Sequence, residues 1–520
     1  MITAPTNLRL IVTYAVCLPL AIFLGYLLAS DNPLNYGTLW GIGLVLFFLA
    51  LPLFLRWHHS FLILTWNLGA VLFFLPGRPE LWLAAAWMSL AISLLQYILN
   101  RRLKLISVPS VSRPLIFLAI VILVTMKLTG GFGFAVFGSE MYGGKRYILV
   151  LSAIVGYFAM SAHQVAPRHA LLLVMLFFAG AISNAIGEAA PFLPTSAYFI
   201  YLLFPVSGTA YDAITSGALG GSGLLSRLSG LAPACAGVCW AMMARFGIRE
   251  LFNARRLNRL ALFLAVVMIG TLGGFRSAVI MLVLTFCLVF YLEGLMRSRL
   301  MPLFFLLVAL VGSFLIGFSD RLPLTMQRSL SFLPLRIDPI ARSNAEASTE
   351  WRLKVWREVL PEIPQHLILG KGLGFSAAEQ AAAAIDERAR GGTTESTEVV
   401  GDYHNGPLSL ILPFGIFGVI GFVWFLAASI RVLYKNYKFG HPAYKTINTF
   451  LFAYFTAKTV FFFLVFGGFY SELMSFTGLV GLSISVNGGV ARRMVVVQPR
   501  ARPQPLRFRP PVRKAVHAAS

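Results

Sequence analysis

Long apolar runs, separated by short polar connections, constrain this chain more than any other feature of its sequence. Fourteen runs approach the roughly 20 residues that a helix needs to cross a bilayer. They are Leu10–Leu28, Thr38–Leu55, Phe61–Leu75, Leu81–Leu99, Pro114–Thr129, Tyr147–Ala162, Ala170–Gly187, Leu231–Ala244, Leu260–Gly273, Ser277–Gly294, Pro302–Phe318, Leu408–Ile430, Ile447–Phe466 and Tyr470–Val486. Because 58% of residues are hydrophobic and only 12% are charged, we expect an all-α polytopic membrane protein with about 12–14 transmembrane helices.

Charge orients these runs across the membrane. Basic residues gather in alternate connections, such as 56–59, 100–104, 245–259 and 431–445, and in the tail from Arg492. Lys and Arg accumulate in cytoplasmic loops, so both termini are expected in the cytoplasm. The net charge of +23 is therefore interpreted as topology rather than as nucleic-acid binding, and the basic tail is expected to contact anionic headgroups of membrane lipids.

The same orientation places the long segment Ser319–Gly406 on the outer face. This segment contains twelve of the twenty acidic residues and is too long to be a simple connection. A capping box at Ser376–Glu379 and the helical spacing of apolar residues in Trp351–Leu360 indicate a helical cap. The expected units are residues 1–187 (N-terminal spans), 188–318 (outward segment and core spans), 319–406 (cap), 407–488 (C-terminal spans) and 489–520 (basic disordered tail).

Four polar side chains on the outer face are candidates for chemistry. Arg227 and Arg276 lie at the mouths of spans, Arg352 lies on the expected cap helix, and His404 lies where the cap re-enters the membrane. Guanidinium groups bind phosphate oxygens in bidentate fashion, and a histidine can accept a proton from an attacking hydroxyl. Together they suit group transfer from a lipid pyrophosphate.

Each candidate also has a structural explanation. A helix-end arginine commonly extends to lipid phosphates, Arg352 could stack on a ring or form an ion pair, and His404 could be a turn residue. Asp402 could orient His404 or itself act as the base, and Asn405 is a further secondary candidate. No Walker, His-Glu-x-x-His, Asp-rich or Gly-x-Ser-x-Gly motif is present, so we expect no cofactor and no metal.

The order of these stretches resembles the bacterial O-antigen ligase and O-antigen polymerase family of membrane glycan transferases. The resemblance rests on Phe275-Arg276-Ser277-Ala278 opening a span, one further span, and then a large loop containing Arg352–Trp356, His366–Gly374 and His404-Asn405. It covers about Arg227 to Val486. Upstream, the family's arginine precedes an Asn-Pro-Asn-like element, whereas this sequence has Leu231-Ala232-Pro233 after Arg227.

The resemblance implies a GT-C-like, metal-independent, inverting glycosyltransferase that uses a glycan on undecaprenyl pyrophosphate. Arg276 and Arg227 would hold the pyrophosphate, Arg352 would assist, and His404 would activate or position the acceptor hydroxyl. Arg276 is counted with His404 among the catalytic residues. The acceptor would be a glycan, a lipid or a protein, and other polysaccharide-assembly proteins are further candidate partners.

Three alternatives remain open at this point. A polymerase of the same family would use another lipid-linked repeat unit as acceptor. A transporter would place ionisable groups near the middle of its spans, where Lys458 is the main example here. A scaffold of an assembly complex would tolerate loss of the arginines and the histidine.

Overall fold

The protein is almost entirely helical in the part of the chain that the structure describes. This structure is a computed structural model that describes residues 6–29, 35–75, 77–100, 102–133, 139, 141–208, 210, 227–381 and 403–493. The named strands within these ranges are the two-residue β1 (Met141–Tyr142) and β2 (Phe375–Ser376), which pair antiparallel. The basic tail beyond residue 493 lies outside the described residues. The chain is thus an all-α protein, as the sequence predicts.

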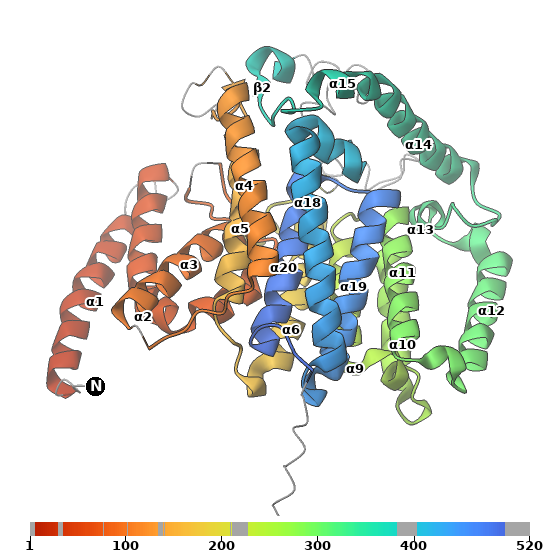
Figure 1. The fold of residues 1–520 in the computed structure, drawn as a ribbon, viewed down its shortest axis with the longest axis horizontal. Coiled ribbons are helices and arrows are strands. Elements are labelled where there is room, and N and C mark those ends of the chain that lie inside the picture. The colour runs from red at the N-terminus through yellow and green to blue at the C-terminus, as the bar shows by residue number, and fades with distance from the viewer. Residues whose placement is uncertain are drawn as a thin grey trace, which may run out of the picture.

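Most of the helices run side by side in one bundle (Figure 1). The α-helices described before the cap are α1 (Thr6–Leu28), α2 (Tyr36–Thr65), α3 (Leu81–Leu99), α4 (Pro109–Thr129), α5 (Gly144–Ser161), α6 (Ala170–Ala179), α7 (Asn184–Glu188), α9 (Leu231–Leu251), α10 (Leu257–Thr271), α11 (Arg276–Leu292) and α12 (Leu300–Phe318). The cap contains α13 (Leu324–Ser329), α14 (Pro339–Val359) and α15 (Ile363–His366), and the chain returns through α18 (Gly406–Phe439), α19 (Lys445–Leu464) and α20 (Phe469–Asn487).

Fewer helices qualify as membrane spans than the sequence predicts. Eight helices among the described residues are long and apolar enough to cross a bilayer, or nine if one bent pair counts as a span, against the 12–14 expected. The difference arises because several apolar runs form short helices: α10 has 15 residues and α11 has 17. The protein is nevertheless a multi-pass membrane protein.

The second and third predicted spans are a single helix with a sharp bend. Within α2, the pieces Gly37–Ala50 and Pro52–Thr65 meet at 93°, and the residues after Thr65 leave the helix. Pro52 has no N–H to donate and is the residue type expected at such a kink. The expected cytoplasmic connection at 56–59 therefore lies inside a helix, which corrects that boundary.

The core of the bundle is formed by helices from the two ends of the chain. The helix α5 packs along α20, α4 packs along α18, and α19 lies between α18 and α11. Large aromatic residues fill the centre, including Trp66, Phe422 and Phe455, all fully buried. In contrast, α12 has no buried residue and stands apart from the bundle (Figure 1). The candidate site thus rests on a rigid central block rather than on α12.

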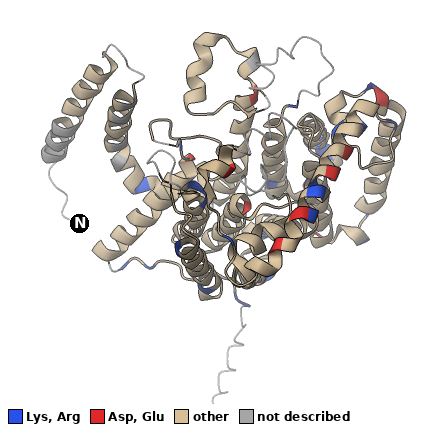
Figure 2. Cartoon of the chain, turned by 90° about the horizontal axis from the view of Figure 1, so that it is seen from above, with Lys and Arg blue, Asp and Glu red and all other residues tan. Residues whose placement is uncertain are grey.

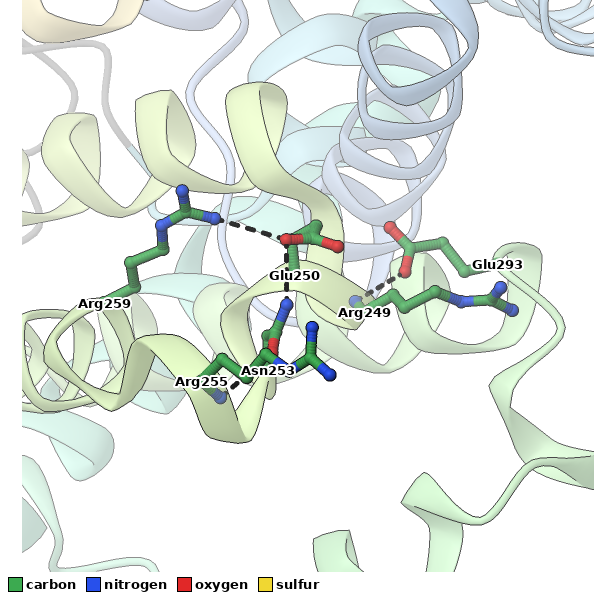
Figure 3. A network of polar contacts seen from close by, with 6 residues as sticks. All are labelled: Arg249, Glu250, Asn253, Arg255, Arg259 and Glu293. Atoms are coloured by element: carbon green, nitrogen blue, oxygen red, sulfur yellow. Dashed lines mark hydrogen bonds and ion pairs between the residues drawn. The ribbon is translucent and has the colours of Figure 1, made fainter.

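A polar network fixes the end of the bundle opposite the cap (Figure 3). The carboxylate of Glu293, which follows α11, accepts hydrogen bonds from the backbone N–H groups of Ile248 (3.0 Å) and Arg249 (2.9 Å) in α9. Gly247, in the left-handed region at φ +63°, kinks α9 here and exposes these N–H groups. Arg259 of α10 pairs with Glu250 at 3.4 Å. These contacts tie together α9, α10 and α11, whose opposite ends form the candidate site.

The described residues within 319–406, which are 319–381 and 403–406, form a mainly helical cap over the other end of the bundle. Seen from above, acidic and basic residues follow one another along the cap helix that crosses the bundle (Figure 2). A small second core, made of Val355, Val359, Tyr403, Leu408 and Leu412, joins α14 to the start of α18. We call the end of the bundle that the cap covers the cap face.

The glycine-rich stretch of the cap docks on a kink in α18. Pro413 and Gly415 (φ +60°) interrupt that helix. The freed backbone groups bond to the cap: Lys371 N donates to Leu412 O at 2.8 Å, and Ile416 N donates to Leu367 O at 2.7 Å. The cap is therefore held to the bundle by backbone hydrogen bonds as well as by apolar packing.

Two smaller predictions for the segments 188–230 and 319–406 are confirmed within the described residues. Glu379 N donates to Ser376 Oγ at 3.2 Å and Ser376 N donates to the Glu379 carboxylate at 2.5 Å, so the capping box forms. The stretch Tyr198–Val206, expected to be too short to span, lies mostly in a 3-10 helix, Thr195–Leu202.

Candidate active site

A cavity of about 490 Å³ lies between the cap and the bundle. It is lined by Arg227, Phe275, Arg276, Ser277, Ile280, Arg328, Phe332, Ser348, Thr349, Arg352, His404, Val465 and Phe466. The lining residues come from α11, α13, α14, the α19–α20 connection and the segments before α9 and α18. We call this cavity the arginine pocket, because four arginines and no acidic residue line it.

Arg276 is the first residue of α11 and points to the cap helix. Its Nη2 donates to Ala345 O and to Thr349 Oγ1 of α14, both at 3.0 Å. The N-terminus of a helix carries a partial positive charge, which adds to that of the guanidinium. Arg276 therefore both fixes the cap to the bundle and supplies positive charge to the pocket.

Arg227 and Arg328 share one neutral acceptor. Asn344 Oδ1, on α14, accepts from Arg227 Nη2 at 3.2 Å and from Arg328 Nε at 2.7 Å. Arg328 Nη1 also donates to the backbone oxygen of Gly274. Since Asn344 carries no charge, it orients two guanidiniums while leaving their positive charge available to an anion.

Gly274 makes this close arrangement possible. Its backbone lies in the left-handed region at φ +73°, which residues with a Cβ rarely adopt. A Cβ at this position would lie 3.2 Å from Arg227 Cδ and 3.7 Å from Arg328 Nη1. The glycine before α11 thus lets both side chains pass directly over the backbone.

Like charges are concentrated in the arginine pocket. Burial, followed by repulsion from Arg227, Arg276 and Arg352, lowers the pKa of Arg328 to about 10. Burial also lowers the pKa of Arg227. Among the described residues, none of the ion pairs includes Arg227, Arg276 or Arg328. A bound anion would relieve this repulsion, so the pocket is suited to bind one.

His404 lies at the edge of the pocket between two rings. Its imidazole is 5.4 Å from the Trp351 ring and 4.9 Å from the Phe466 ring, measured between centroids. The guanidinium of Arg352 lies 5.7 Å from the same Phe466 ring. The ring stacking considered for Arg352 is therefore present, and it aims the arginine at the pocket beside the histidine.

The backbone of His404 is strained and is held by anchored neighbours. Its φ of +50° lies in the left-handed region, which costs a non-glycine residue energy and clusters at functional sites. On one side, Tyr403 is buried and its carbonyl accepts from Trp356 Nε1 at 2.8 Å. On the other, the side chain of Asn405 caps α18 by accepting from Leu408 N at 3.1 Å. The fold thus imposes the position of the imidazole.

The structure brings together all four residues that the sequence singles out, Arg227, Arg276, Arg352 and His404. Of the secondary candidates, Asn405 caps a helix and does not line the pocket, and Asp402 lies outside the described residues. Within the described ranges, no group of three or more His, Cys, Asp or Glu residues is arranged to hold a metal ion.

Sequence reasoning missed two members of the site. Arg328 lies in a short amphipathic stretch of the cap, 5% exposed, and Asn344 is one of many polar residues on α14. A usable signal was the arginine itself, since Arg328 occurs in the cap within an otherwise uncharged stretch, 322–335. Nothing in the sequence distinguishes Asn344 from its neighbours.

These features define a polytopic membrane protein whose cap and bundle enclose a cationic, histidine-bearing pocket. Residues 257–423 match the family model described as O-antigen ligase, so this part of the chain is similar to that family. The match supports a function of the ligase or polymerase type in glycan assembly. The match includes Arg276, Arg328, Arg352 and His404. It is shorter at both ends than the range expected from the sequence, about Arg227 to Val486. Comparison with curated proteins gave no significant match.

Proposed function

We propose that this protein transfers a glycan from undecaprenyl pyrophosphate to an acceptor hydroxyl at the periplasmic face of a bacterial inner membrane. The observation that carries the proposal is the arginine pocket, where four guanidiniums and one imidazole converge without an acidic side chain in the lining. The alternative functions do not account for this convergence: a scaffold does not need it, and a transporter would need its charges deeper among the spans.

The arginines would bind the donor pyrophosphate. Arg276 at the N-terminus of α11, Arg227 and Arg328 on their shared amide, and Arg352 on the cap each present N–H groups to the pocket. Negative charge grows on the pyrophosphate as the sugar leaves, and donors held in place stabilise such charge without reorganisation. Because the guanidiniums themselves supply this positive charge, the proposed reaction requires no metal ion.

His404 would accept the proton of the acceptor. The acceptor oxygen attacks the anomeric carbon from the side opposite the pyrophosphate, the carbon–oxygen bond to the pyrophosphate breaks, and the hydroxyl proton moves to the imidazole. The products are the glycosylated acceptor, with inverted anomeric configuration, and undecaprenyl pyrophosphate. The imidazole then returns its proton to water.

The orientation belongs to the same proposal. The cap face would be periplasmic, and both termini would be cytoplasmic, because the basic connections gather at the opposite end of the bundle. The domain units proposed from the sequence follow from this orientation, with residues 319–406 as the periplasmic cap.

The test is deletion of the protein in its native host, followed by mass spectrometry of cell-surface glycans. We expect one glycan to accumulate on its lipid carrier and to disappear from its acceptor. Restoration by the wild type, but not by Arg276→Ala or His404→Ala, would support the assigned roles. If every glycan conjugate is unchanged in the deletion strain, the proposed function is wrong.

Two control variants make this test specific. His404→Asn removes the base but keeps a residue that tolerates the left-handed backbone, so loss of transfer at normal protein levels separates chemistry from folding. Arg321→Ala removes an exposed arginine that stacks on Phe318 outside the pocket, and it should restore transfer fully.

The acceptor decides between ligase and polymerase. A polymerase leaves its product on the lipid carrier with a longer chain, whereas a ligase moves the chain to a different molecule. Mass spectrometry of the carrier-linked fraction in the complemented strain therefore distinguishes the two reactions.

A further inference from the structure

A second cavity of about 540 Å³ lies apart from the arginine pocket and differs from it in charge. It is enclosed by residues 66–71, 80–82, 181–187, 204–207 and 229–233 together with Met474. Its volume is within the range of small-molecule sites, about 300–1,000 Å³. The single ionisable residue among its lining residues is Glu80, an acid, so this cavity lacks the cations that a phosphate group requires. We call it the amide cavity.

Two asparagines give this cavity its polar character. Asn67 Nδ2 donates to Phe177 O at 2.8 Å, and Asn184 Nδ2 donates to Ala181 O at 2.9 Å. Each amide is thus oriented by a backbone carbonyl, and each Oδ1 makes no hydrogen bond to any other described residue. These oxygens are acceptors for hydroxyl groups, and the lining also includes the hydroxyls of Ser183 and Ser229.

The rest of the cavity wall is held rigidly. Trp66 and Trp82 are fully buried, with ring centroids 5.2 Å apart. Trp82 Nε1 donates a hydrogen bond to the carboxylate of Glu80 at 2.5 Å and so fixes the orientation of that carboxylate. Behind the wall, Glu188 accepts from Ser229 Oγ at 2.8 Å and from Gly230 N at 2.6 Å. The cavity therefore presents fixed oxygen acceptors rather than adaptable side chains.

An intermediate cavity of about 350 Å³ lies between the two sites and shares lining residues with each. It shares Phe275, Ser277 and Phe466 with the arginine pocket, and it shares Asn67, Ala181 and Pro233 with the amide cavity. Aromatic residues and the Lys458–Glu472 ion pair (3.2 Å) line it. The three cavities follow one another through the protein, with opposite charge at the two ends.

We propose that the amide cavity binds an uncharged sugar unit of the acceptor glycan, remote from the hydroxyl that reacts. A transfer reaction has two substrates, and the charge of the arginine pocket selects the anionic donor. Hydrogen-bond acceptors without cations select a neutral polyol and disfavour phosphate and uronic acids. The acceptor would be an oligosaccharide that passes through the intermediate cavity toward His404. This inference rests on the proposed function.

The first test is photocrosslinking in living cells with the full-length protein. Phe204, which lines the amide cavity, is replaced by p-benzoylphenylalanine, and Leu68 serves as a second position in case one variant fails to fold. Phe305 on α12, 58% exposed and outside all three cavities, is the matched control. We expect hexose or acetamidosugar adducts without phosphate at the two cavity positions and lipid adducts at Phe305. In the ligase reaction, whose acceptor carries no polyprenol, sugar adducts that carry polyprenyl phosphate would overturn the proposal, because they would place the donor there, and so would lipid adducts alone.

The second test is kinetic and uses the acceptor identified from the deletion strain. Asn184→Ala removes one acceptor oxygen and should raise KM for the acceptor by about tenfold while leaving KM for the donor unchanged. An unchanged acceptor KM would contradict the proposal. The two failures are distinguishable: an intact glycan profile in the deletion strain refutes the transfer reaction, whereas normal transfer without sugar adducts refutes only the acceptor site.

Discussion

Arg328 donates a hydrogen bond of 2.7 Å to Asn344, and the oxygen that accepts it also accepts from Arg227 at 3.2 Å. A carboxylate at this position would pair with both cations and reduce their attraction for an anion. An amide orients them and leaves the charge in place. The cap helix α14 thus contributes to the pocket through a residue that does not line it.

Asn344→Asp should therefore stabilise the protein and impair the reaction. The new carboxylate would lie within hydrogen-bond distance of two guanidiniums, and buried charge-assisted contacts contribute about 1.5–3 kcal/mol. We expect a higher Tm together with a donor KM raised by at least tenfold, measured by thermal unfolding and by transfer kinetics in nanodiscs. Asn344→Leu, the control, should lower both Tm and donor affinity. A normal donor KM in Asn344→Asp would show that the charge of this site is unimportant.

Arg276→Lys should lose most of its transfer activity. Arg276 makes two bonds to α14, and a lysine ammonium cannot reproduce this planar fork while also contacting a phosphate. We expect kcat to fall by about tenfold to a hundredfold. The reason is that a hydrogen-bond donor that acts mainly on the leaving pyrophosphate stabilises the transition state. Full activity would mean that a point charge suffices.

Inorganic pyrophosphate should raise the Tm of the purified protein, and this shift should become smaller at high pH. Repulsion from its neighbours helps to lower the pKa of Arg328 to about 10, so a bound anion favours its charged form. Proton loss from Arg328 removes one attraction, so binding weakens as pH rises through about 10. Without pyrophosphate, the stability of the folded state should instead rise as pH increases above about 10, because deprotonation of Arg328 relieves its repulsion from the neighbouring arginines.

The control for this experiment is Arg328→Gln, which keeps hydrogen-bonding groups but removes the charge. Its Tm shift with pyrophosphate should be smaller at neutral pH and should not change between about pH 9 and about pH 11. An equal shift in both proteins would show that pyrophosphate binds elsewhere.

The sequence predicts the class of fold well because membrane helices depend on hydropathy and length, which can be read residue by residue. It overestimates the spans where apolar residues continue through a bend, as at Pro52, because hydropathy carries no information about helix direction. Arg227, Arg276 and His404 can be singled out from the sequence because each lies next to a span end or a re-entry point, whereas Arg352 lies within the cap helix α14. Arg328 and Asn344 were not identified because their importance depends on how the cap folds back onto the bundle, a long-range contact that local patterns do not encode.

Gly274→Ala should reduce donor affinity through crowding, and Gly294→Ala offers a matched control at the other end of α11. Both glycines have similar left-handed backbones, φ +73° and φ +72°, so each alanine should cost roughly 1–2 kcal/mol in strain. Only at Gly274 would the new methyl group meet a side chain, that of Arg227, at 3.2 Å, whereas nothing lies within 4 Å at Gly294. We expect similar losses in Tm for the two variants but a raised donor KM for Gly274→Ala alone. Equal donor KM values in the two variants would show that the close approach of Arg227 to this turn has no role in binding.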